Sequence, residues 1–162
     1  MSGKLAFNII PAQIFLGIFW FKNGFIDKVC GIFMGIAMPD VAYHGDTWAG
    51  WKEYIVGVWD KSVFAHVALS PLYNALFPVL IILQCLPFIF IFISLLKGEF
   101  LTGRQRPWLY RGAVASLFVT SAMIISQTLS GASDGEYLWH LLAAGMVIIM
   151  YIRHVEKDSC CA

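Results

Sequence analysis

Charged residues are scarce in this chain. Only 13% of its 162 residues are Asp, Glu, Lys or Arg, whereas about a quarter would be charged in a typical soluble domain. Hydrophobic residues account for 59%. The composition therefore argues against a water-soluble domain and predicts a protein that lies mainly in a lipid bilayer.

The chain also lacks a strong net charge. A formal net charge of +1 gives no broad basic field of the kind that attracts nucleic acid. The arginines gather next to apolar runs instead of spreading along one face of a domain. We therefore exclude nucleic acid as a partner.

The four cysteines are poorly placed for pairing. Cys30 is expected outside the membrane, Cys85 within an apolar span, and Cys160 and Cys161 on the inner side. The bilayer would then separate the cysteines that a disulfide or a zinc site must bring together. We expect neither a disulfide nor a metal site.

The chain does contain long apolar stretches. A transmembrane helix needs about 20 mainly apolar residues, and such stretches cover residues 5–21, 72–96, 110–129 and 137–152. A signal peptide is the alternative for the first, but no small-residue cleavage site precedes Lys22. We therefore predict four spanning helices.

Small residues in the third stretch predict close helix packing. In membranes, small side chains allow two helix backbones to approach each other. The residues expected to face other helices are Ala113, Ala115, Ser116 and Ala122.

Basic residues assign each loop to a side of the membrane. The loop between the second and third stretches, together with the start of the third, contains Arg104, Arg106 and Arg111, and Lys and Arg in short loops resist translocation. The tail, residues 153–162, is also basic at its start, whereas the loop before the last stretch is acidic. The prediction is an all-α integral membrane bundle of four transmembrane helices, with both termini cytoplasmic and residues 22–70 extracytoplasmic.

The predicted outer segment, residues 22–70, mixes aromatic and charged residues. Trp48, Trp51, Tyr54 and Trp59 lie among lysines and acids, a pattern typical of an amphipathic helix at the level of the lipid headgroups. A folded loop whose tryptophans pack on the bundle explains the pattern equally well. A periplasmic or soluble partner could dock on this segment.

Polar and aromatic residues are expected to meet where the four helices reach the outer side. Pockets of this kind bind small ligands or quinone headgroups in helix bundles, although interfacial Trp and Tyr also occur without any site. We call this predicted site the outer pocket. Its residues are Trp20, Lys22, Asn23, Tyr73, Asn74, Gln127, Tyr137, Trp139 and His140.

His140 is the strongest single candidate in the outer pocket. An ionisable side chain at membrane depth is rare and often functional. Its ring nitrogen could ligate a haem or a chlorophyll or hydrogen-bond a quinone, and the structural alternative is an interhelical hydrogen bond to Gln127. The sequence leaves the cofactor open among quinone, lipid and pigment, and identifies no catalytic residue.

Two motifs resemble a known family. Residues 16–25 read Leu-Gly-Ile-Phe-Trp-Phe-Lys-Asn-Gly-Phe, and residues 98–104 read Gly-Glu-Phe-Leu-Thr-Gly-Arg. Together with four spans and internal termini, they are similar to the DoxX/DoxD-like membrane proteins. The resemblance implies a multi-pass protein of a bacterial or archaeal plasma membrane, linked to redox chemistry and similar to the membrane subunit of thiosulfate:quinone oxidoreductase.

Departures from the family pattern suggest a role within a larger assembly. Family members often carry an acidic residue early in the second helix, whereas here the nearest polar residue is Gln84. We expect a small integral subunit of an energy-converting or oxidoreductase complex, in contact with membrane lipids and other membrane subunits. The alternative is a stand-alone quinone-linked oxidoreductase of the thiosulfate:quinone type.

Overall fold

The structure is a computed structural model. It describes residues 9–33, 56–57, 59–61, 63, 65–66, 69–101, 104–130 and 136–160. The secondary structure of these parts of the chain is helical, without a strand. The prediction of an all-α protein is therefore confirmed for the described residues.

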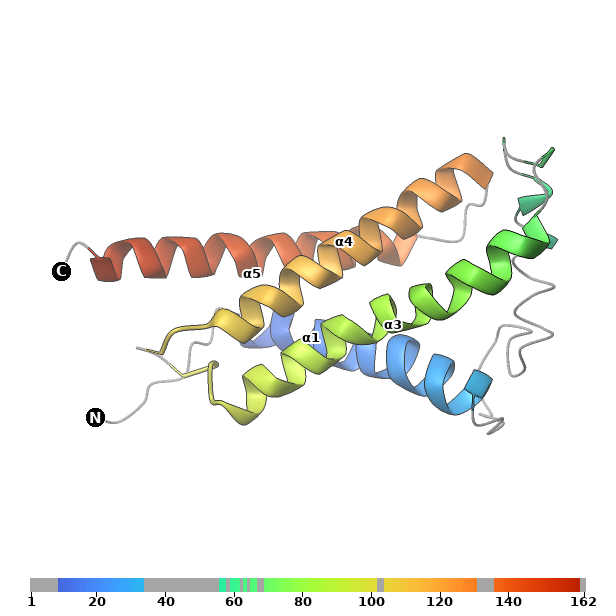
Figure 1. The fold of residues 1–162 in the computed structure, drawn as a ribbon. Helices are drawn as coiled ribbons and strands as arrows, with labels where there is room; N and C mark the ends of the chain where they lie inside the picture. Colours follow the sequence, from blue (N-terminus) through green and yellow to red (C-terminus); the bar gives the residue numbers. More distant parts are fainter. Residues whose placement is uncertain are drawn as a thin grey trace.

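Four long helical segments form an up-and-down bundle (Figure 1). They are α1 with η1 (Ile10–Trp20 and Phe21–Phe33), α3 (Leu69–Leu96), α4 (Pro107–Ser130) and α5 (Glu136–Cys160). Helix α4 packs against both α3 and α5, and α1 packs against the same two helices. This places α1 diagonally opposite α4. The start of α1, the end of α5 and the α3–α4 turn lie at the same end of the bundle (Figure 1).

Two helices in the described part of the chain are long and apolar enough to cross a membrane. They are Pro107–Ile125 within α4 and Glu136–His154 within α5, and Ile81–Leu96 forms a shorter apolar helical stretch. The structure thus supports a membrane protein only to the extent that two helices of the described part could cross a bilayer. The four-span topology stays a prediction.

The first helix continues past the end that the sequence predicted for it. Residues after Phe21 were expected to leave the membrane, because Lys22 and Asn23 are polar. The helix itself does not end there, because η1 continues it as a π-helix of 13 residues. The side-chain amide of Asn23 donates to the Phe19 carbonyl at 3.1 Å, so its polarity is satisfied within the helix.

A close helix contact holds this extension against α3. Gly24 is buried, and a Cβ atom there would collide with the backbone carbonyl of Gln84. The Cys85 thiol donates to the Gly24 carbonyl at 3.1 Å. The absence of a side chain at Gly24 therefore allows η1 to lie directly on α3. The predicted interfacial residues Trp48, Trp51 and Tyr54 lie outside the described part of the chain.

The bundle has an apolar interior and an apolar exterior. Fully buried side chains come from every long helix and include Leu16, Ile91, Leu109 and Leu141. Large apolar side chains also point outward; Ile18 on α1, Leu96 on α3, Phe118 on α4 and Met150 on α5 are each more than 60% exposed. Soluble monomers rarely expose large continuous apolar areas, so this exterior is suited to lipid.

The small residues of the third stretch divide between two faces of α4. Ala113 and Ser116 are buried, as predicted, and Ala115 is half-buried. The expectation for Ala122 is wrong, because this residue is exposed. With 3.6 residues per turn, Ala122 is turned about 120° around the helix from Ser116 and so belongs to a different face.

Candidate functional site

Trp20, predicted for the outer pocket, is instead engaged within the bundle. Its side chain is 1% exposed, and its indole N–H donates to the Ser116 hydroxyl at 2.8 Å. A buried Trp needs such a partner for its polar end. Trp20 therefore fixes the packing of α1, and its nitrogen is occupied.

The other predicted pocket residues differ in exposure. Lys22 is exposed and Asn23 is half-buried. At the start of α5, the Tyr137 ring lies 5.7 Å from the Phe19 ring, so this end of α5 meets the end of α1. The side chains of Tyr73 and Asn74 lie outside the described part of the structure.

His140 lies on the outward side of α5. Its side chain is exposed, as is that of neighbouring Trp139 at 60%, whereas Leu138 and Leu141 are buried. Gln127, its suggested partner, is half-buried. The structure thus brings Tyr137 to α1 but places His140 and Trp139 on the exterior of the bundle.

Buried polar side chains inside the bundle form a second group of interest. The Gln13 amide donates to the Ser94 hydroxyl at 3.2 Å, which joins α1 to α3. Some buried acceptors have no hydrogen-bond partner among the described atoms, and they include Gln13 Oε1, Gln84 Oε1 and Thr120 Oγ1. Sequence reasoning missed Gln13 and Ser94. The only sequence feature that could have identified these two residues was their polarity within apolar runs.

The α3–α4 turn is organised by a buried acid. Glu99 is 3% exposed, and its two carboxylate oxygens accept the backbone N–H groups of Trp108 and Leu109 at 3.2 and 2.8 Å. A carboxylate at this position satisfies free donors at the N-terminus of α4 and interacts favourably with the helix dipole. Glu99 is therefore a side-chain cap for α4.

The arginines of this turn have different environments. Arg106 is 2% exposed; it donates to the Leu101 carbonyl at 2.9 Å, and its guanidinium lies 5.6 Å from the Tyr151 ring centre. Arg104 and Arg111 are exposed. The sequence predicted the same role for all three, but Arg106 links the turn to α5.

Two cations share one aromatic ring beside this turn. The Arg111 guanidinium carbon lies 4.7 Å from the Trp108 ring centre, and Lys97 Nζ lies 5.8 Å from it. Both distances are within the usual range of cation–π attraction.

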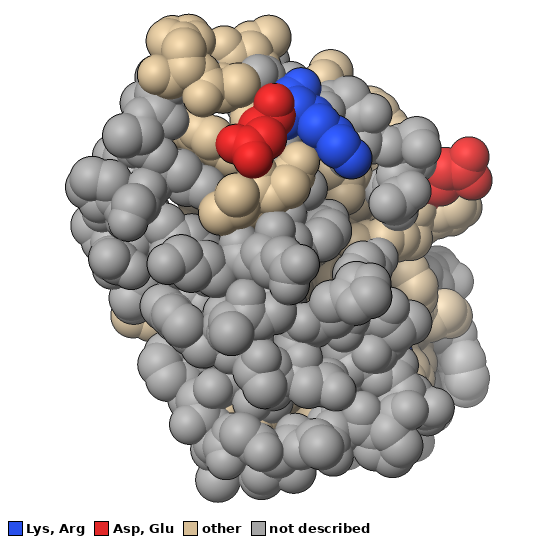
Figure 2. Space-filling view, turned by 90° about the vertical axis from the view of Figure 1, so that its right-hand side faces the viewer, with Lys and Arg blue, Asp and Glu red and all other residues tan. Residues whose placement is uncertain are grey.

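At the opposite end of the bundle, acidic and basic side chains of the described residues lie next to each other (Figure 2).

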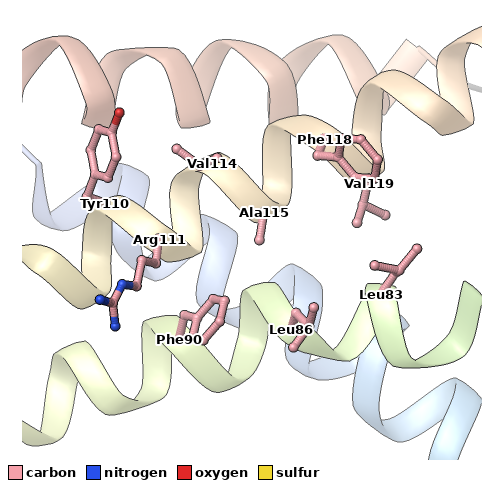
Figure 3. A pocket seen from close by; sticks show the side chains of 9 residues that line it. All are labelled: Leu83, Leu86, Phe90, Tyr110, Arg111, Val114, Ala115, Phe118 and Val119. Atoms are coloured by element: carbon pink, nitrogen blue, oxygen red, sulfur yellow. The ribbon is translucent and has the colours of Figure 1, made fainter. Parts of the chain in front are cut away.

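A groove runs between α3 and α4 next to these cations (Figure 3). It encloses about 390 Å³, which is within the range of small-molecule sites. The surface that lines the groove is apolar throughout, because Tyr110 and Arg111 border it with their carbon atoms. The lining residues are Leu83, Leu86, Phe90, Tyr110, Arg111, Val114, Ala115, Phe118 and Val119.

The described residues offer no obvious metal centre. No group of three or more His, Cys, Asp or Glu side chains in this part of the chain is arranged to hold an ion. Cys30 is half-buried, and Cys85 is buried with its thiol directed at the Gly24 carbonyl. The described geometry is therefore that of a bundle with an apolar groove and a basic edge.

Comparisons with known proteins find no match. This holds for protein-family models, for curated proteins and for solved structures. The similarity to the DoxX/DoxD-like family accordingly rests on the two sequence motifs and the predicted four-span topology.

Proposed function

We propose that this protein is a four-helix integral membrane subunit of a multi-subunit complex of the oxidoreductase or energy-converting type. It would lie in a bacterial or archaeal plasma membrane with both termini cytoplasmic. Its role would be to pack against partner subunits and to hold a lipid, quinone or pigment, rather than to catalyse a reaction itself.

The use of polar side chains within the bundle is the observation that carries this proposal. Trp20 and Ser116 pair with each other, Gln13 pairs with Ser94, and Glu99 caps α4. These groups therefore act in holding the helices together. Hydrogen bonds between side chains commonly help to join helices in lipid, because the hydrophobic effect does not drive helices together there.

The exterior supports the same proposal. Every long helix presents large apolar side chains outward, including Phe15, Phe92, Phe118 and Val147. Lipid or the helices of other membrane subunits can cover such surfaces. The resemblance to the DoxX/DoxD-like family supports a redox complex as the setting.

Isolation of the native assembly tests the proposal. The tagged full-length chain would be purified from its native membranes in a mild detergent, and co-purifying polypeptides and cofactors identified by mass spectrometry and absorbance. We expect defined partner subunits in constant ratio. A partner-free chain that reduces a soluble quinone with thiosulfate would overturn the proposal and favour the stand-alone enzyme.

Variants on α5 test the outer pocket in the same preparation. Trp139→Ala removes an exposed aromatic side chain that is predicted for the pocket. Met150→Ala removes an apolar side chain of similar exposure farther along the same helix. We expect the first variant to lower retention of the bound quinone or pigment and the second to leave it unchanged. Equal retention in both would argue against this pocket.

A further inference from the structure

The groove between α3 and α4 is an elongated apolar channel. Arg111 and Phe90 lie at one end of it, and Leu83 and Val119 lie at the other (Figure 3). The stretch of α4 from Arg111 to Val119 rises by about 12 Å. The groove can therefore hold part of an extended hydrocarbon chain parallel to the helices.

The groove is open to the outside of the bundle. Two of its lining residues, Phe118 and Val114, are 64% and 41% exposed. In a membrane this side of the bundle faces the acyl chains of the lipids. An occupant can thus enter sideways from the bilayer without any opening of the helices.

The cation at one end suggests the chemistry of the occupant. The Arg111 guanidinium lies over the Trp108 ring and donates to no acceptor among the described residues, so its N–H donors remain available. Within the described part of the chain, no carboxylate pairs with Arg111. Glu99 is already bound to backbone N–H groups of α4. Arg111 can therefore offer paired donors to a phosphate.

A second cation strengthens the positive charge at this end. Lys97 is exposed and lies over the same Trp108 ring as Arg111. This end also carries the basic turn that the proposed topology places in the cytoplasm. The cytoplasmic leaflet contains anionic lipids, and these attract lysine and arginine near the membrane surface.

We propose that the groove binds one anionic phospholipid, with an acyl chain between α3 and α4 and its phosphate against Arg111. This inference depends on the membrane location given under the proposed function. It does not depend on the outer pocket, which is predicted for the other end of the bundle.

Lipid retention by matched variants tests this site. Arg111→Gln removes the cation, and Ala115→Leu fills the groove from α4. The controls are Arg104→Gln, an exposed arginine that does not line the groove, and Ala122→Leu, an exposed alanine on α4. Each full-length protein would be incubated with equal amounts of phosphatidylglycerol and phosphatidylcholine, and bound lipids counted by native mass spectrometry.

We expect one tightly held phosphatidylglycerol in the unmodified protein. Arg111→Gln should lower the preference for phosphatidylglycerol about fivefold, and Ala115→Leu should lower the retention of both lipids. The two control variants should behave like the unmodified protein. Thermal melting in detergent would establish whether the variants are folded. If Ala115→Leu does not fold, the result for Arg111→Gln decides the test.

Several outcomes would overturn the inference. They are equal retention of the two lipids, equal losses in Arg111→Gln and Arg104→Gln, or displacement of the lipid by added quinone. A chain that stays in the membrane but shows no lipid preference would contradict this site alone. A chain recovered in the soluble fraction without detergent would contradict the proposed function as well.

Discussion

The Trp20 indole donates a hydrogen bond to the Ser116 hydroxyl at 2.8 Å, and so connects residues 96 positions apart in the sequence. The two residues belong to α1 and α4, the helices on one diagonal of the bundle. Because both side chains are buried, the bond is shielded from competing water. It therefore helps to set how α1 is placed between α3 and α5.

Removal of the acceptor should destabilise the bundle measurably. Ser116→Ala leaves the Trp20 N–H without its partner, and we expect a loss of about 1 kcal/mol in the free energy of unfolding. Trp20→Phe combined with Ser116→Ala should cost less than the sum of the two single changes. Unfolding in mixed detergent micelles would measure this, with Ser121→Ala as a control that should change stability by less.

Gly24 should not tolerate even one added methyl group. In Gly24→Ala, the new Cβ would collide with the Gln84 backbone carbonyl, which cannot move as a side-chain tip can, so η1 must separate from α3. We expect a loss of about 2 kcal/mol or more.

Gly17→Ala provides the matched control for Gly24→Ala. A Cβ at Gly17 would meet Ile91 Cγ2 at 3.4 Å, an ordinary contact with a side chain. We expect near-normal stability in this variant, measured by thermal melting in detergent. Equal melting temperatures for the two variants would show that η1 and α3 are not in close contact.

Glu99 should contribute to the stability of α4 through its two N–H partners. We expect Glu99→Ala to cost about 1–2 kcal/mol, in the range of other lost helix caps. Glu99→Gln should cost less, because one amide oxygen can still accept a hydrogen bond. Hydrogen exchange at the Trp108 and Leu109 amides would follow the loss locally.

An exposed acid on another helix is the control for the Glu99 variants. Glu136 lies in the first turn of α5 and is exposed. Glu136→Gln should leave exchange at the start of α4 unchanged. If the Trp108 and Leu109 amides exchange no faster in Glu99→Ala than in Glu136→Gln, Glu99 does not cap the helix.

The two ends of the bundle should react differently in intact cells. Gln105 is exposed at the α3–α4 turn, and His66 is exposed in the segment before α3. The background variant has every cysteine except buried Cys85 replaced by serine. In this background, His66→Cys should react with a membrane-impermeant maleimide added outside the cells. Gln105→Cys should react only after permeabilisation, and external labelling there would reverse the proposed topology.

Much of the architecture could be predicted because it follows from local patterns. Apolar runs of about 20 residues predict helices, and the arginines between residues 104 and 111 mark the turn that the structure shows between α3 and α4. The start of α4 was also predicted within a few residues. The end of the first helix was not, because Lys22 reads as a boundary unless the contact of Gly24 with α3 is known.

The candidate sites were less predictable because they depend on how distant helices face each other. The same sequence pattern contains Arg104, Arg106 and Arg111, yet only Arg106 is buried. His140 stood out as an ionisable residue near an apolar run, and its exposure became known only once α5 was packed.

Composition and the lengths of the apolar runs were enough to predict a helical, apolar protein, since both act locally along the chain. Which polar groups are paired inside, and which cation borders a groove, became known from the packed bundle. A side chain's burial and partners depend on rotation and register between helices, and these result from packing among residues far apart in sequence.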